Sequence, residues 1–100
     1  MYGIPDESLN MIMKTIASLP EIQEAVLYGS RAMGNHKNGS DIDIAVAGKN
    51  LSPDTVLRLS TLLNEELPLP YYFDVTDLSR LEHRELAEHI EKHGKVIFRR

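Results

Sequence analysis

Three aspartates and a Gly-Ser pair are the residues of this sequence whose types and spacing could do chemistry. Gly29-Ser30 closes one apolar run, and ten residues later Asp41 and Asp43 alternate with isoleucines in the next. Asp74 interrupts a third apolar run, Tyr-Tyr-Phe-Asp-Val. Carboxylates two positions apart on a strand project from one face, so they can converge on a shared cation. Mg²⁺ suits them, because it takes a few carboxylate oxygens and completes its shell with water and substrate phosphate.

The Gly29-Ser30 turn offers a place for that phosphate. Glycine lets the backbone approach a ligand closely, and the N–H groups of a first helical turn are unpaired donors that attract anions. A Gly-Ser pair alone also makes an ordinary turn, and an isolated Asp-x-Asp is usually a solvated strand face. The addition of Asp74 makes the pattern specific, because three neighbouring carboxylates repel one another and metal ions are the simplest remedy.

The elements that must position these residues follow from hydrophobic periodicity. We expect the order helix, strand, short helix, strand, helix, strand, helix, strand. The first helix follows Pro5 and stops at Pro20, and a later one begins at Ser52-Pro53. We expect Asp77 or Ser79 to cap the last helix and Gly94 to end it in a left-handed conformation. The strands are predicted at residues 25–28, 41–47, 71–75 and 96–98.

These elements predict one domain over residues 1–100 with an α/β (α+β) fold, in which a single small mixed β-sheet carries helices packed mainly on one face. In the strand 41–47, Ile42, Ile44 and Val46 should face one way, and Asp41, Asp43, Ala45 and Ala47 the other. The sequence does not settle strand order or direction. The short loop at residues 48–51 is compatible with a helical crossover.

Composition limits the kinds of molecule that this protein is expected to bind. The chain has a net charge of −4, no cysteine and no basic stripe, so we expect no long nucleic acid as partner. No apolar run is long enough to span a membrane, and the first residues lack an export pattern, which fits a cytoplasmic protein. A small phosphorylated ligand is compatible with this charge if cations accompany it.

Gly29-Ser30, ten residues and then Asp41-Ile-Asp43 match the G-S-x10-D-x-D signature. The chain therefore resembles the nucleotidyltransferase superfamily, whose fold is shared with DNA polymerase beta. Its size, the G-S-R-A turn and the S-D-I-D-I-A-V strand are similar to the minimal nucleotidyltransferases of the MntA type. The resemblance covers nearly the whole chain and implies the polymerase beta-like core.

The resemblance implies an enzyme that transfers AMP from ATP to a tyrosine of a helical HEPN-domain toxin, with this chain as the antitoxin. By position, Gly29 and Ser30 would hold the β- and γ-phosphates, and Arg31 is counted with them as nucleotide-binding. Asp41, Asp43 and Asp74 would ligate two Mg²⁺ ions, and Asp74 would also help to deprotonate the attacking hydroxyl.

Several alternatives stay open at this point. Arg31 could instead point to solvent or pair with an acid, and Met33 replaces a basic residue that the related pattern often has. A binding module that neutralises a toxin by covering it, or a domain that holds nucleotide without turnover, would also fit. His89 and His93 lack the adjacent glutamate of a zinc-protease helix, so we interpret them as a solvated helix end. The acceptor residue, the nucleotide preference and the oligomeric state, including a homo-oligomer, are not fixed by the sequence.

Overall fold

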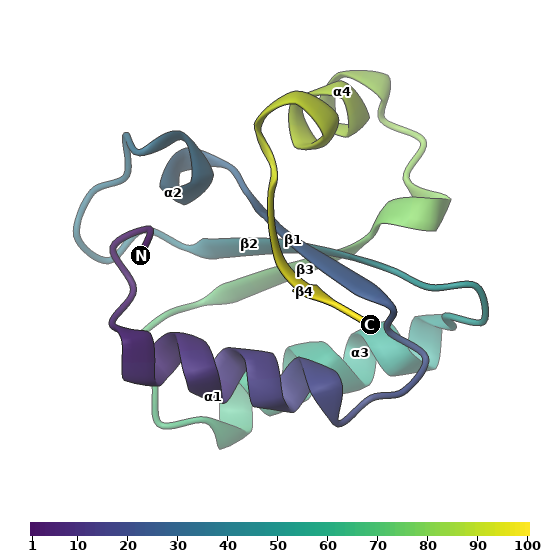
Figure 1. Cartoon of the computed structure of the whole chain (residues 1–100), viewed down its shortest axis with the longest axis horizontal. Coiled ribbons are helices and arrows are strands. Elements are labelled where there is room, and N and C mark those ends of the chain that lie inside the picture. The colour runs from purple at the N-terminus through teal and green to yellow at the C-terminus, as the bar shows by residue number, and fades with distance from the viewer.

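A four-stranded mixed sheet forms the centre of the molecule (Figure 1). The computed structural model describes residues 1–100. The strands are β1 (Glu24–Tyr28), β2 (Ile42–Ala47), β3 (Phe73–Asp77) and β4 (Lys95–Arg99), and their order across the sheet is β3-β2-β1-β4. β1 pairs antiparallel with both β2 and β4, whereas β2 and β3 run parallel. The predicted mixed sheet is confirmed, and β3 and β4 are its edges.

The crossover between β2 and β3 runs through α3 (Pro53–Thr61), which continues as the π-helix η1 (Leu62–Glu66). Ser52 caps α3 by accepting a hydrogen bond from the Thr55 N–H, and Pro53 occupies the first turn. Both are the helix-start features predicted from the sequence. The helical crossover returns the chain to the end of the sheet at which β2 begins, so β3 runs parallel to β2. Asp43 and Asp74 each lie near the start of their strand, at that same end of the sheet.

The larger core lies between the sheet and the two helices α1 (Asp6–Ala17) and α3, which cover the same face (Figure 1). Ile12 and Ile16 of α1 are fully buried there. From β2, this core takes the alternate residues Ile42, Ile44 and Val46. The predicted alternation along β2 is therefore confirmed, and the carboxylates must leave the sheet on its other face.

A smaller cluster occupies that other face, beneath α4 (Arg84–His93). It contains Val26, Tyr28, Ala45 and Ile90. Most of the buried residues thus lie on the α1 and α3 side, as expected for helices packed mainly on one face. α4 and the short helix α2 (Ser30–Met33) stand on the opposite side of the sheet from α1 and α3 (Figure 1).

The last helix differs from its prediction at both ends. Asp77 caps only a 3₁₀ turn, η2 (Leu78–Arg80), and α4 begins at Arg84 with His83 as its capping residue. Gly94 was expected to be left-handed, but its φ is −64°. Glycine is required there for space, because a Cβ would collide with the Ile90 carbonyl oxygen. Close packing, not backbone conformation, explains that glycine.

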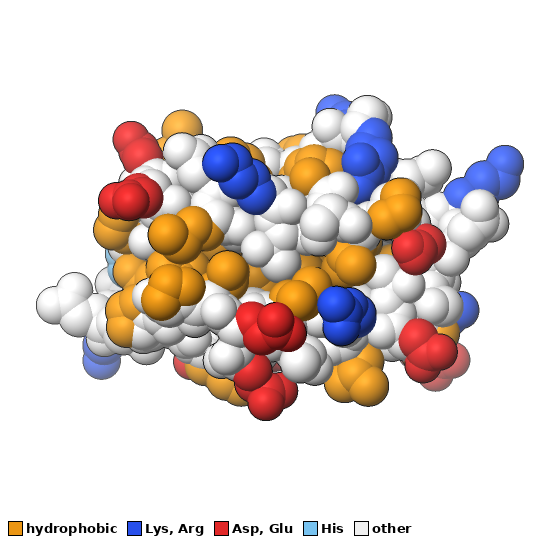
Figure 2. Space-filling view, turned by 90° about the horizontal axis from the view of Figure 1, so that it is seen from below, with side chains coloured by type: hydrophobic (Ala, Val, Ile, Leu, Met, Phe, Trp, Pro, Cys, Tyr) orange, Lys and Arg blue, Asp and Glu red, His pale blue; other side chains and the backbone are white.

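The face formed by α1 and α3 shows hydrophobic side chains among scattered acidic and basic ones (Figure 2). Leu57 of α3 is the most exposed leucine on it, at 67%. No helix of the protein combines the length and the apolar character that crossing a bilayer requires.

Candidate active site

The pairing of β2 with β3 brings two predicted site residues, Asp43 and Asp74, together on the α4 face. Asp43 lies opposite Asp74 of β3 and opposite Tyr28 of β1. Residues paired across neighbouring strands project from the same face, so Asp43 and Asp74 are adjacent. Asp41 precedes the first residue of β2 and shares the alternation of Asp43. Asp41 and Asp74 are exposed and Asp43 is half-buried.

The charges in this group are not balanced by the protein. Burial raises the pKa of the Asp43 carboxyl above its usual 3.8, and the carboxylates of Asp74 and Asp41 raise it further, while His89 lowers it. None of the three ion pairs in the structure includes these aspartates. A cation from outside the chain would therefore relieve a repulsion that the fold leaves in place.

The donor set suits Mg²⁺ without enclosing it. No group of three or more His, Cys, Asp or Glu side chains is arranged closely enough to hold a metal ion. Mg²⁺ does not require such a cage, because it commonly binds one or two carboxylates and takes its remaining ligands from water and phosphate. Neighbouring, unpaired carboxylates on an open face fit that mode of binding.

Gly29 places the Gly-Ser turn directly against Asp43. Its φ is +78°, in the region that favours glycine, and it caps the N-terminus of α2. A Cβ at this position would collide with the Asp43 carboxylate. Ser30 is half-buried and begins α2. The structure thus brings the turn and the acidic strand together, as the signature spacing predicts.

His89 of α4 joins this group, although no sequence pattern indicated that it would. Its Nε2 accepts a hydrogen bond from the Gly29 N–H at 3.2 Å. Its ring meets the Tyr28 ring edge-on, with centroids 6.3 Å apart. The interpretation of His89 as part of a solvated helix end is therefore wrong. Only the tertiary packing of α4 could reveal the contact.

Tyr28 lines the same face and is 6% exposed. Its hydroxyl lies 3.0 Å from Thr76 Oγ1 on β3. Burial raises the pKa of the Tyr28 phenol above its usual 10.0, and the carboxylates of Asp43 and Asp74 act in the same direction. A neutral tyrosine beneath the acids adds no charge to the site and ties β1 to β3 across β2.

Asn64 fixes the start of β3 from the other side. Its side-chain amide accepts from the Phe73 N–H at 2.7 Å and donates to the Phe73 carbonyl at 2.9 Å. These two bonds imitate a neighbouring strand at a residue that is otherwise on the sheet edge. Because Phe73 directly precedes Asp74, Asn64 helps to set the position of that carboxylate.

Arg31 neither points to solvent nor pairs with an acid, so both of those interpretations are wrong. It is 2% exposed. Its guanidinium donates to the Ser40 carbonyl at 2.8 and 3.1 Å and to the Tyr2 carbonyl at 3.1 Å. It also lies 5.0 Å from the centre of the Tyr71 ring. These contacts leave Arg31 as the buried link between α2, the N-terminal segment and the residue before Asp41.

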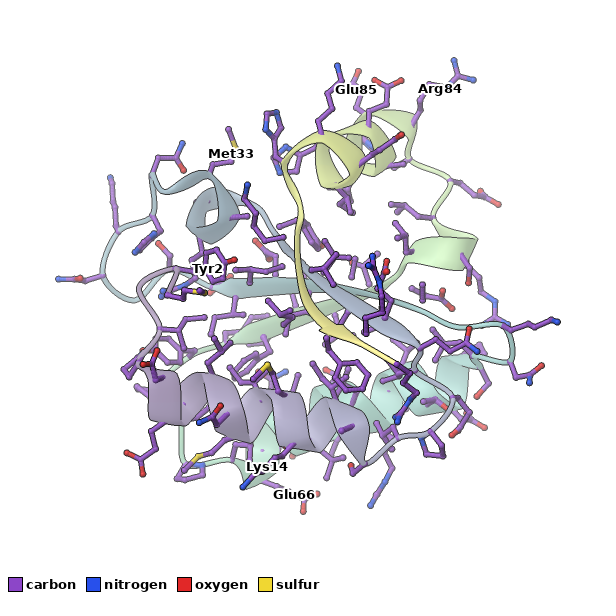
Figure 3. The ribbon with its side chains drawn as sticks, viewed as in Figure 1. Tyr2, Lys14, Met33, Glu66, Arg84 and Glu85 are labelled. Carbon is purple, nitrogen blue, oxygen red and sulfur yellow. The ribbon has the colours of Figure 1, made fainter.

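Met33 replaces the expected basic residue at the end of α2. It projects from the outer side of that helix, whereas Tyr2 lies beneath it (Figure 3). Its side chain is 49% exposed.

The three surface hollows of the molecule are lined by none of the predicted site residues. The carboxylates therefore stand on an open surface.

A mixed sheet, a Gly-Ser turn and paired aspartates are the features that the resemblance to nucleotidyltransferases predicts. The family described as polymerase beta, nucleotidyltransferase matches residues 10–100. The chain belongs to this nucleotidyltransferase family. No curated protein matches it.

Several solved structures with a similar fold are toxin–antitoxin complexes. A toxin–antitoxin structure with AMP-PNP has a TM-score of 0.76 and 28% identity, over 92% of this chain and 73% of that one. A tri-AMPylated Shewanella oneidensis HEPN toxin in complex with its MNT antitoxin has a TM-score of 0.69 and 26% identity, over 92% and 70%. A complex named MntA–HepT matches with the same values.

Proposed function

We propose that this chain is a Mg²⁺-dependent nucleotidyltransferase that moves AMP from ATP onto a hydroxyl of a helical HEPN-domain partner protein. The observation that carries the proposal is the pairing of Asp43 with Asp74 beside the Gly29 turn. Two similar structures support the substrate and the acceptor, since one contains AMP-PNP and the other an AMPylated HEPN toxin.

Each site residue has a role in this proposal. The backbone N–H groups at Gly29 and Ser30, with the Ser30 hydroxyl, bind the β- and γ-phosphates of ATP. Asp41, Asp43 and Asp74 hold two Mg²⁺ ions. The Asp74 carboxylate also accepts the proton of the attacking hydroxyl. Arg31 acts on the site indirectly, because its guanidinium is committed to the Ser40 and Tyr2 carbonyls.

Bound Mg²⁺ ions would neutralise the triphosphate and stabilise the entering and leaving oxygens of an in-line displacement at the α-phosphorus. The chain itself supplies positioning: the turn orients the phosphates, and the parallel strands set the two carboxylates side by side. In the transfer, the acceptor oxygen bonds to the α-phosphorus as the bond to pyrophosphate breaks. The hydroxyl proton passes to Asp74.

The partner is inferred from the open position of the site. The carboxylates lie in none of the surface hollows, and Asp41 and Asp74 are exposed. The domain thus has no separate pocket for an acceptor, so the acceptor must bring its own complementary surface. A folded protein presenting a hydroxyl meets that requirement, and the HEPN toxins of the similar complexes are such proteins.

The test is to purify this chain with a HEPN-domain protein encoded beside it and to incubate both with ATP and Mg²⁺. We expect the partner's mass to rise by one or more AMP groups and pyrophosphate to be released. Asp43→Asn and Asp74→Asn should abolish both signals. Glu82→Gln is the matched control, because it removes an exposed carboxylate that is not one of the site residues.

Measuring toxin activity and ATP binding in the same mixtures separates the alternative functions. If the Asp43→Asn variant still neutralises the toxin and the partner never gains mass, the chain is a binding module. If ATP binds but no pyrophosphate is released with the partner present, the chain is a regulatory nucleotide-binding domain. Either result would overturn the transferase proposal.

A further inference from the structure

His89 is a side chain of α4 that reaches the Gly-Ser turn, and the proposed function gives it no role. It is separated from Gly29 by 60 positions, so their hydrogen bond exists only through tertiary packing. Its Nε2 lies 3.2 Å from the Gly29 nitrogen and acts as the acceptor. The ring nitrogen thus already occupies a backbone donor that the proposed function assigns to phosphate.

The two acceptors exclude each other. A backbone N–H makes one well-aligned hydrogen bond, and that bond weakens steeply as its angle departs from linear. A phosphate oxygen that accepts from Gly29 must therefore lie where Nε2 now lies. The turn also cannot shift toward Asp43 to offer its N–H at another angle, because that carboxylate already fills the space next to Gly29 in which a Cβ would lie.

His89 is free to leave without breaking other polar contacts. The His89 side chain makes one hydrogen bond, the one with Gly29. Its ring also packs against the rings of Tyr28 and His93, whose centroids lie 6.3 and 5.4 Å away. α4 itself has a single buried residue, Ile90. A rotation of the side chain or a small shift of the helix would release the donor at little cost.

We propose that His89 competes with the nucleotide for the Gly29 N–H: it holds this donor in the free protein, and a bound phosphate displaces it. The inference rests on the proposed function, because it takes Gly29 as a phosphate-binding residue. It adds that α4 is part of the nucleotide site and that its contact with the turn changes between the free and the bound protein.

The experiment measures binding of AMP-PNP with Mg²⁺ to the full chain by calorimetry, for the wild type, His89→Ala and His93→Ala. Removing the competing acceptor should lower the Kd by about three- to tenfold, the equivalent of one neutral hydrogen bond. His93→Ala is the matched control, because it removes the neighbouring ring but no bond to Gly29, and its Kd should equal that of the wild type. Alanine has the highest helix propensity and both residues lie in α4, so neither variant should impair folding.

A second measurement uses the wild type alone. The Gly29 amide and the His89 ring nitrogens are followed by NMR in the free protein and at saturating AMP-PNP with Mg²⁺. We expect Nε2 to be the accepting nitrogen in the free protein and to lose that bond in the complex, together with a shift of the Gly29 amide resonance.

The outcomes distinguish the inference from the function on which it rests. If the wild type binds AMP-PNP and His89→Ala binds it equally or less tightly, or if the Gly29–His89 bond persists at saturation, the competition is overturned while the nucleotide site stands. If neither the wild type nor His89→Ala binds AMP-PNP, the proposed function fails and the inference fails with it.

Discussion

At the scale of single residues, the contact between Gly29 and Asp43 explains why the turn cannot carry any other amino acid. Two separate constraints meet at Gly29: a φ of +78° and a carboxylate in the space of a Cβ. Gly34, at the other end of α2, has a φ of +80° but open space around it. A comparison of the two glycines therefore distinguishes the effect of backbone strain from the effect of the close Asp43 carboxylate.

We expect Gly29→Ala to destabilise the protein by about 2–4 kcal/mol, because it adds a collision with Asp43 to the strain of a positive φ. Gly34→Ala should cost only about 1 kcal/mol, since it carries the strain alone. Urea denaturation of both variants measures the difference. Equal losses would show that the Asp43 carboxylate yields to a methyl group without cost.

At the scale of elements, the features that could be predicted from the sequence are those encoded by local residue patterns. The alternation in β2 identified the face of Asp43, and Ser52-Pro53 identified the start of α3, because both signals lie within a few residues. The pairing of Asp43 with Asp74 depended on strand order, which periodicity does not contain. His89, Arg31 and Asn64 were missed or misplaced for the same reason, since their partners lie far along the chain or are backbone atoms that a sequence does not distinguish.

Arg31 connects α2 to the loop before β2, so its replacement should act on the position of Asp41. We expect Arg31→Lys to lower stability by about 2–3 kcal/mol, because one ammonium cannot span the Ser40 and Tyr2 carbonyls as the guanidinium fork does. The kcat of AMP transfer should fall, with little change in the KM for ATP. The exposed Lys37→Met, in the same loop, is the control. A raised KM with unchanged stability would make Arg31 a nucleotide ligand instead.

Asn64 connects η1 to β3 and should be needed for the position of Asp74. Asn64→Ala removes both side-chain partners of the Phe73 backbone at a partly buried position, so we expect a loss of about 1–3 kcal/mol and lower transfer activity. Glu65→Ala, exposed on the same π-helix, should change neither. Thermal unfolding and the AMP-transfer assay provide the measurements. Activity preserved in Asn64→Ala would show that β2 pairing alone holds Asp74.

At the scale of the whole molecule, the unbalanced acids lower the stability of the metal-free fold. The pKa of Asp43 is raised above its usual 3.8, so folding is favoured by its protonation. That contribution is complete below pH 3.8 and is lost as the pH rises through the higher folded-state pKa. At neutral pH the ionised carboxylate therefore opposes folding.

We expect Asp43→Asn to raise the Tm of the metal-free protein at neutral pH by about 2–4 °C, since solvent screening limits the cost of a partly exposed carboxylate to roughly 0.5 kcal/mol. The gain should shrink as the pH is lowered toward 4, because Asp43 itself becomes protonated there. Mg²⁺ should raise the Tm of the wild type more than that of Asp43→Asn, through preferential binding to the folded state. A lower Tm for Asp43→Asn would show that the carboxylate is stabilising.

For the proposed transfer, the edge position of β3 bears on the size of acceptor that can reach the site. Asp74 belongs to the last strand, so no further strand borders it, and its side chain is exposed. An exposed sheet edge can accommodate a bulky, rigid acceptor, because neither protein has to change conformation for the reacting groups to meet. A small acceptor would gain little binding energy there, because no pocket encloses it. The architecture thus favours reaction between two folded surfaces.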